Sequence, residues 1–260
     1  MKPFALQTYT IRDAFREPAD APAAFARTRD IGYTHIQFSG VTSITPAEAA
    51  AMARDAGLTI VASHCGYAAA TGSPDAVMAD AETLGCRDVA VASLPAEFHH
   101  EDGFRRAGEA LSAAAEAFHR AGFRLSYHNH AFEFARYGTK TGLDLMAEAA
   151  GHAPLCWEFD TYWLVHGGCD PVEWLRRFKG RIPLVHLKDR VVLNGKPWGE
   201  PVMAEVGYGN LNWVGILGAC ADGGCEWWIV EQDTCPGDPF DSAKKSLDWL
   251  KANAGFLIGT

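Results

Sequence analysis

Residues 182–189, IPLVHLKD, carry the pattern that decides the fold: a short apolar run with the character of a buried strand stops at polar, chemically active side chains. Three further segments repeat it, LSYHNHAFE at 125–133, CWEFD at 156–160 and WWIVEQD at 227–233. Four such strand ends in succession predict a common mouth where they converge. Histidine, aspartate and glutamate at such a mouth are metal ligands or acid–base groups, which indicates an enzyme.

Outward from these segments, strand and helix patterns alternate along the whole chain. Capping side chains followed by proline at 45–46, 73–74 and 170–171 mark helix starts. No GxGxxG follows the first strand, where residues 7–12 read QTYTIR, so an open dinucleotide-binding sheet is disfavoured. Eight repeats with short connections predict an α/β fold, the (β/α)8 TIM barrel, in one domain over 1–260. The expected strands are 4–8, 35–38, 59–63, 88–92, 124–128, 155–159, 183–187 and 227–230.

Composition and charge narrow the class of partner. The chain has 260 residues, of which 48% are hydrophobic, enough for a substantial core. A formal net charge of -9 argues against a surface that grips nucleic acid or anionic membranes, because both need clustered lysine and arginine. We therefore expect a small-molecule substrate, and the sequence leaves a homo-oligomer open.

Cysteine usage and the absence of long apolar runs indicate the compartment. The seven cysteines include no CxxC pair, which disfavours a zinc knuckle or a disulfide framework. The apolar run in residues 1–13 is too brief for a signal peptide, and no segment approaches the roughly 18 apolar residues of a membrane span. These features predict a reduced, cytoplasmic protein.

Several segments together resemble a known family. YHNHAFEF, EFDTYWLVHGGCDP, RIPLVHLKD, EVGYGNLNW and IVEQD are similar to the sugar phosphate isomerase/epimerase family, the xylose isomerase-like TIM barrels that also include inosose dehydratase and endonuclease type IV. The resemblance runs from LQTYTIRD near the N-terminus to the VEQD strand, nearly the whole chain. It implies one divalent metal at the barrel mouth, manganese first, with zinc, cobalt or iron(II) also compatible with a mixed histidine and carboxylate site. Three of its ligands carry over as Asp160, His186 and Glu231.

The fourth ligand departs from the family pattern. Many relatives have glutamate at the end of strand five, where this chain has His128, with Glu133 five residues further on. Either side chain would complete the shell, and Glu133 is favoured slightly because a carboxylate better neutralises a cation. Gln37 and Tyr208 also stand where relatives often have acids, so the substrate is left open.

The resemblance also implies roles in proton transfer. A cation bound to a carbonyl and its adjacent hydroxyl acidifies the C–H between them by stabilising an enediolate. Glu231 is the candidate base, with Glu133 or His128 as its partner, and Lys188 would anchor an oxygen or protonate a leaving hydroxyl. The expected function is a metal-dependent isomerase or epimerase of a sugar or keto-sugar, and the open alternative is a dehydratase or lyase of a keto-inositol or 3-keto-sugar. Candidate substrate-binding residues are Gln7, Gln37, His64, His130 and Trp163.

Two other function classes are less favoured. A DNA-repair endonuclease of the same family would need a histidine three residues after Asp160, where Trp163 stands, and another after strand four, where the chain reads VASLPAE. A non-catalytic sugar-binding subunit would have lost ligands that this chain keeps. Arg136 and Arg190 are the available anion contacts and form no phosphate motif, which favours an unphosphorylated substrate.

Overall fold

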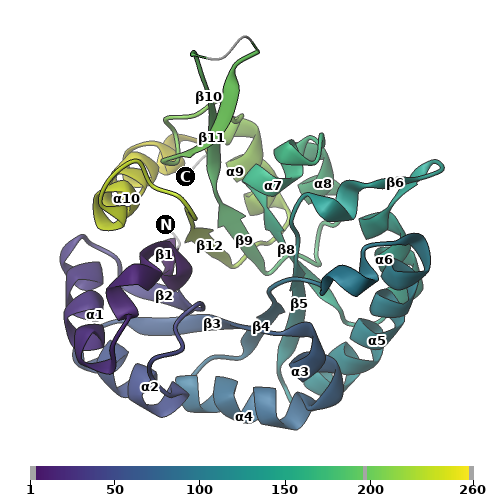
Figure 1. The fold of residues 1–260 in the computed structure, drawn as a ribbon, viewed down its shortest axis with the longest axis horizontal. Helices are drawn as coiled ribbons and strands as arrows, with labels where there is room; N and C mark the ends of the chain where they lie inside the picture. The colour runs from purple at the N-terminus through teal and green to yellow at the C-terminus, as the bar shows by residue number, and fades with distance from the viewer. Residues whose placement is uncertain (1–3, 196–197, 258–260) are drawn as a thin grey trace.

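The computed structural model describes residues 4–195 and 198–257, and at its centre eight parallel strands close into a barrel. Each strand pairs with its neighbour and β12 pairs with β1, which closes the ring seen in Figure 1. The expected TIM barrel is therefore confirmed, and every expected strand ends within two residues of the observed one. The strands are β1 (Phe4–Gln7), β2 (His35–Phe38), β3 (Thr59–Cys65), β4 (Asp88–Val91), β5 (Arg124–His128), β8 (Cys156–Asp160), β9 (Leu184–Leu187) and β12 (Trp227–Val230).

Helices surround the barrel and cover the outer faces of its strands (Figure 1). Thr45 caps α2 in a capping box and Asp170 caps α8, as the sequence predicts, whereas Ser73 makes no side-chain cap to α4. The α-helices are α1 (Ala21–Asp30), α2 (Pro46–Asp55), α3 (Tyr67–Gly72), α4 (Pro74–Leu84), α5 (Glu101–Arg120), α6 (Gly142–Ala150), α7 (Thr161–His166), α8 (Pro171–Arg177), α9 (Trp213–Asp222) and α10 (Pro239–Leu257). Short 3-10 helices are η1 (Thr8–Phe15), η2 (Pro18–Asp20), η3 (Ala96–Phe98) and η4 (Phe132–Phe134).

The interior of the barrel changes character along the strands. A small apolar cluster inside it contains Ala5, Val61, Ala62, Leu184 and Ile229. Side chains alternate between the two faces of a strand, so the residue two positions further on points into the same interior. On β1, β9 and just past β12 those next residues are Gln7, His186 and Glu231. The barrel is thus filled by apolar groups below and polar groups at the carboxyl ends of the strands.

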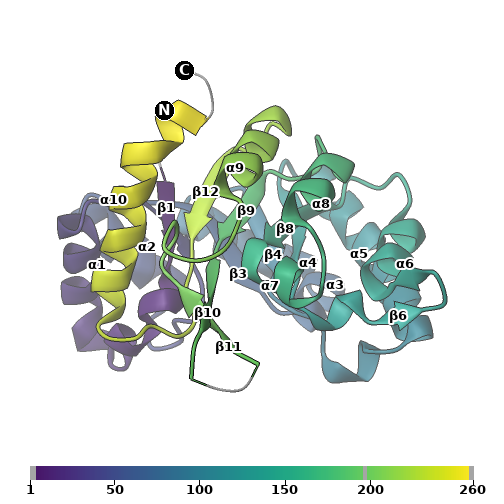
Figure 2. The same ribbon diagram turned by 90° about the horizontal axis from the view of Figure 1, so that it is seen from above.

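Two short strand pairs lie outside the barrel, β6 (Arg136–Tyr137) with β7 (Lys140–Thr141) and β10 (Asp189–Leu193) with β11 (Glu200–Ala204). The second pair follows β9 directly and projects away from the barrel (Figure 2). Within the described ranges, no helix is long and apolar enough to cross a membrane.

Candidate active site

Four of the strand-end side chains expected at the barrel mouth come together. His128, Asp160, His186 and Glu231 are buried, and each offers one ligand atom, these atoms all lying within 4.8 Å of one another. His186 Nδ1 lies 2.8 Å from Glu231 Oε2, and His128 Nε2 lies 3.6 Å from Asp160 Oδ2. The strand register also places Asp160 beside His186, because β8 and β9 pair these two residues directly. The convergence gives two carboxylates and two imidazoles in one cluster.

This donor set fits a divalent cation. Among the described residues, His128 Nε2 is buried without a hydrogen-bond partner, an expensive state for a polar atom unless a further group binds it. Imidazole and carboxylate together suit manganese, zinc, cobalt or iron(II). A cation held by this cluster would satisfy His128 Nε2, so the residues present fit the metal that the family resemblance implies.

Lys188 forms the cationic part of the site. Its ammonium is buried, with Nζ 2.7 Å from Glu231 Oε2, 2.8 Å from Asp233 Oδ1 and 2.9 Å from Asp160 Oδ2. Burial alone would lower the pKa of Lys188, but these three carboxylates raise it above its usual value. Lys188 is therefore charged, and it holds the Glu231 carboxylate in place. Asp233 was not among the candidate residues, although its position two residues after Glu231 was a signal for it.

A second polar layer lies beneath the four-group cluster and is centred on Glu158. Glu158 Oε2 lies 2.6 Å from His64 Nε2, and its Oε1 accepts a hydrogen bond from Gln37 Nε2 at 2.7 Å. Gln37 Oε1 in turn accepts from Gln7 Nε2 at 2.9 Å and lies 2.7 Å from His186 Nε2. His64, Glu158 and His186 also lie close enough to hold an ion, but their facing atoms are already bonded within the layer. We interpret the layer as a hydrogen-bond network.

The charges in this layer follow from its contacts. Burial would raise the pKa of Glu158, but His186 and His64 hold it well below the usual range, so the side chain is a carboxylate. Burial would lower the pKa of His186, yet the carboxylates of Glu158 and Glu231 raise it to about 10. For His64 burial dominates and lowers the pKa, despite Glu158 beside it. At neutral pH, His64 is thus an uncharged imidazole next to an ionised glutamate.

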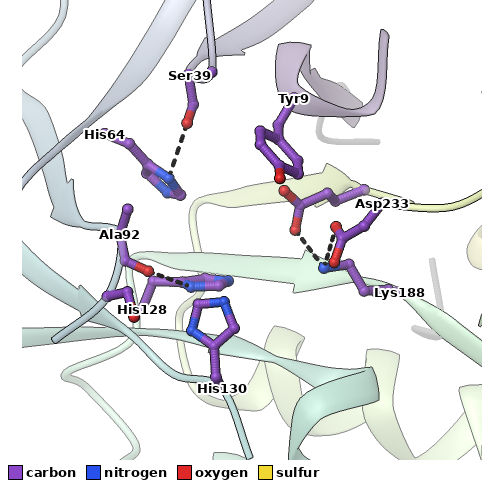
Figure 3. A pocket seen from close by; sticks show the side chains of 11 residues that line it. Tyr9, Ser39, His64, Ala92, His128, His130, Lys188 and Asp233 are labelled. Carbon is purple, nitrogen blue, oxygen red and sulfur yellow. Dashed lines mark hydrogen bonds and ion pairs between the residues drawn. The ribbon is translucent and has the colours of Figure 1, made fainter. Parts of the chain in front are cut away.

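A cavity of about 270 Å³ opens above these layers (Figure 3). In the view of Figure 3, Ser39 and His64 lie on one side, Lys188 and Asp233 lie on the other, and His128 and His130 lie below. A volume of this size suits a small molecule, and its walls are dense in acid–base groups. The lining residues are Tyr9, Ser39, Gly40, His64, Ala92, Ser93, His128, His130, Lys188, Glu231 and Asp233.

Glu133 lies outside the four-group cluster. Its carboxylate is buried, accepts a hydrogen bond from the Tyr127 hydroxyl at 2.7 Å, and accepts another from the backbone N–H of His130 at 2.9 Å. Burial raises the pKa of Glu133 to about 7. The expectation that Glu133 completes the metal shell does not match this geometry, which brings His128 to the cluster instead. Tyr127 and His128 are successive residues of β5, so their side chains point to opposite faces of the strand. Glu133 bonds to Tyr127 and therefore does not reach the cluster that contains His128.

The substrate-binding candidates divide into two groups. His64 and His130 line the cavity, and burial lowers the pKa of His130 to about 3, so it is neutral. Gln7 and Gln37 are fully buried, bond to each other and do not line the cavity. Trp163 does not line the cavity either, and the centroid of its ring lies 5.3 Å from the centroid of the His130 ring.

Asp160 has a structural role as well as its place in the cluster. Its Oδ1 accepts a hydrogen bond from the backbone N–H of Trp163 at 3.0 Å and so caps α7, while Oδ2 faces the cluster.

Gly207 and Gly209 form a tight turn, and both backbone N–H groups donate to Asp189 Oδ2 at 2.9 Å. These two backbone N–H groups are therefore already hydrogen-bonded to a side chain of the protein.

Comparisons with known proteins agree with this architecture. A family model described as a xylose isomerase-like TIM barrel matches residues 25–253. An inosose dehydratase from Clostridium beijerinckii is 24% identical over 173 residues, which cover 61% of this chain and 57% of that protein. The chain spans about half the length of the curated relatives it matches.

Solved structures extend the likeness in fold. A sugar phosphate isomerase/epimerase from Parabacteroides distasonis matches with a TM-score of 0.79 at 24% identity, over 97% of this chain and 94% of that one. A xylose isomerase-like TIM barrel protein from Mycobacterium smegmatis, in complex with magnesium, matches with a TM-score of 0.73 at 14% identity, over 100% and 98%. At such identities the likeness concerns the fold.

Proposed function

The chain belongs to the xylose isomerase-like TIM barrel family, and from this premise we propose that it is a divalent-cation-dependent isomerase or epimerase of a small, unphosphorylated sugar or keto-sugar. The observation that carries the proposal is the convergence of His128, Asp160, His186 and Glu231 beside a cavity rich in acid–base groups. The acidic net charge, -9, supports a small-molecule carbohydrate partner and disfavours nucleic acid and membrane partners.

The same four residues would hold the cation. When bound, it would supply positive charge that stabilises an enediolate as a proton leaves the carbon next to a carbonyl. Two imidazoles in the donor set disfavour a magnesium site built from oxygen ligands, and of manganese, zinc, cobalt and iron(II) we rank manganese first on the family resemblance. His128 takes the fourth position in this proposal, and Glu133 instead holds the backbone of His130.

Glu231 is the proposed base for the carbon-bound proton. Its carboxylate lines the cavity, and Lys188 and His186 hold its pKa low despite burial, so the side chain is ionised at neutral pH. Lys188 lies at the cavity wall and keeps that carboxylate oriented, and it would turn one N–H from a carboxylate partner to a substrate oxygen. The neutral ring of His130, whose Nδ1 is buried without a partner in the described part of the chain, offers a further hydrogen bond.

Dehydration is the second candidate, favoured by the inosose dehydratases among the curated relatives. The same enediolate that is reprotonated in an isomerase would here lose a hydroxyl from the neighbouring carbon. Lys188 would be the acid for the leaving hydroxyl, because its ammonium is at the cavity wall. The two candidates differ in product: an isomer keeps the mass of the substrate and a dehydrated product loses one water.

Substitution of Glu231 by glutamine tests the proposal. Manganese-loaded protein would be incubated in D2O with a panel of ketoses, inososes and 3-keto-sugars, and NMR would follow deuterium next to the carbonyl. Glu231→Gln should lose on the order of 10²- to 10⁴-fold in exchange rate, since the amide accepts no proton, while metal analysis shows near-normal occupancy. Equal exchange by the wild type and Glu231→Gln would exclude Glu231 as the base.

A further inference from the structure

Three residues outside the proposed metal cluster form a continuous hydrogen-bonded line from the cavity into the barrel. We propose that Ser39, His64 and Glu158 are a proton relay, in which the Ser39 hydroxyl moves a proton to and from a substrate oxygen. The reaction that the relay serves rests on the proposed function, whereas the relay itself rests on the geometry of these three side chains.

The geometry fixes the direction of each hydrogen bond. His64 Nε2 lies 2.6 Å from Glu158 Oε2, and the Glu158 carboxyl group also accepts from Gln37 Nε2, so we place the hydrogen of this bond on Nε2. His64 Nδ1 is then the free acceptor of a neutral ring, and it lies 3.2 Å from Ser39 Oγ. A hydroxyl, an imidazole and a carboxylate in this order are the arrangement by which proteins activate a serine. Ser39 and His64 line the cavity, whereas Glu158 is buried beneath it.

Both ends of the line are held by buried groups. At the inner end, Glu158 Oε1 accepts from Gln37 Nε2 at 2.7 Å, which leaves Oε2 for His64. At the outer end, the backbone N–H of Ser39 donates to Thr8 Oγ1 at 2.8 Å, and the Thr8 hydroxyl donates to the carbonyl of Ser39 at 2.7 Å. These contacts fix where Ser39 and Glu158 stand relative to the ring, as a relay requires.

The proton count of the proposed reaction gives the relay its task. In the isomerisation branch of the proposed function, a proton must move between neighbouring carbons of a hydroxy-carbonyl compound, and another must leave one oxygen and arrive on the next. Epimerisation at one carbon needs no such oxygen transfer, so the relay serves isomerisation. Glu231 serves the carbon. At the oxygen, the substrate O–H bond breaks as its proton passes to Ser39 Oγ, and the serine proton passes to His64 Nδ1. The resulting imidazolium is balanced by Glu158, and the reverse transfer delivers the proton to the second oxygen.

The placement across the cavity agrees with this division of labour. Figure 3 shows Ser39 and His64 on the opposite side of the pocket from Lys188 and Asp233. Lys188 is the residue that holds the Glu231 carboxylate. A substrate between the two sides would therefore meet the carbon base on one side and the oxygen relay on the other.

The first experiment needs no substrate. In Ser39→Cys, His64 should accept the thiol proton, so iodoacetamide at pH 7 should alkylate position 39 about 10-fold faster than in Ser39→Cys/His64→Gln. Peptide mass spectrometry separates this thiol from Cys65, whose pKa burial raises to about 12 and which serves as the slow internal reference. Ser39→Cys/Glu158→Gln should also react more slowly. Equal rates in the single and double variants, with unchanged melting temperatures, would overturn the relay.

The second experiment separates the relay from the base. In the D2O assay, Ser39→Ala should keep solvent exchange at carbon within a few-fold of the wild type, but lose about 10²-fold in product formation. Glu231→Gln should lose both. If Ser39→Ala keeps both rates, the relay is wrong and the proposed function stands. If position 39 is alkylated rapidly but the wild type exchanges no carbon-bound proton, the proposed function fails and the activated serine stands.

Discussion

The side chain at position 128 decides which atoms the cluster offers to a cation. The strand that carries it, β5, is the one expected from the sequence. An acid was favoured at the fourth metal position because it neutralises a cation better than imidazole. The structure brings His128 to the cluster, where its Nε2 lacks a partner among the described residues, and turns Glu133 towards Tyr127. The preference for an acid considered only charge. The direction in which each side chain points decides which group reaches the cluster.

Two matched substitutions test this assignment. His128→Gln should weaken manganese binding by about 100-fold, because it removes a ligand with a fixed orientation, whereas Glu133→Gln should leave affinity within a few-fold of wild type. Isothermal titration calorimetry with manganese measures both. The reverse pattern would return Glu133 to the metal shell.

Glu133 also predicts a pH dependence of stability. Burial raises its pKa from 4.5 to about 7 in the folded protein, so the folded state binds the proton more tightly than the unfolded state. This contribution is complete below pH 4.5 and is lost as the pH rises through 7, amounting to roughly 3 kcal/mol. Glu133→Gln keeps the neutral form at every pH. Urea unfolding between pH 5 and 8 should therefore show the variant gaining stability relative to wild type as the pH rises, and a constant difference would contradict the shift.

Predictability differed among the site residues for a structural reason. Asp160, His186 and Glu231 could be found because each stands at the carboxyl end of an apolar strand. Glu158 lies within β8, flanked by Trp157 and Phe159, where a polar residue suggests no mouth. Its signal was the spacing of two from Asp160, which places both side chains on the inward face.

At the scale of elements, the eight barrel strands were readable because each buries an apolar run. The strand pair β10–β11 was not among the strands expected from the sequence. It follows β9 and precedes the segment that leads into α9. It stands outside the barrel, with Val192 and Leu193 about half exposed, so no buried-strand pattern marks it. What secures its base is hydrogen bonding, which hydrophobic periodicity does not reveal.

Asp189 is the residue that fastens this element. Its buried carboxylate accepts from the backbone N–H groups of Gly207 and Gly209 and from Trp213 Nε1 at 2.7 Å. Asp189→Asn turns an amide donor towards these N–H groups and should cost at least about 2 kcal/mol of unfolding free energy in urea. Asp13→Asn, which breaks only an exposed ion pair with Arg16, should stay within about 0.5 kcal/mol. Similar losses in the two variants would show that Asp189 does not fasten the hairpin.

At the scale of the whole molecule, the barrel combines an apolar lower interior with a mouth that buries three carboxylates, Glu158, Asp160 and Glu231, and places the half-buried Asp233 with them beside the ammonium of Lys188. Grouping so many acids is costly unless positive charge balances them. His186 shares in that balance, because the carboxylates of Glu158 and Glu231 raise its pKa to about 10 despite burial. A divalent cation bound at the mouth would therefore act on the stability of the whole fold.

Thermal unfolding should report this coupling. A ligand at 100 times its dissociation constant stabilises the folded state by about 2.7 kcal/mol, which for a chain of this size corresponds to roughly 5 to 10 °C in melting temperature. We expect manganese to raise the melting temperature of the wild type by that amount and EDTA to reverse it. His128→Gln should respond far less at the same manganese concentration, because the substitution removes one of the four proposed ligands. If manganese shifts the wild type and His128→Gln equally, the cation binds elsewhere on the molecule.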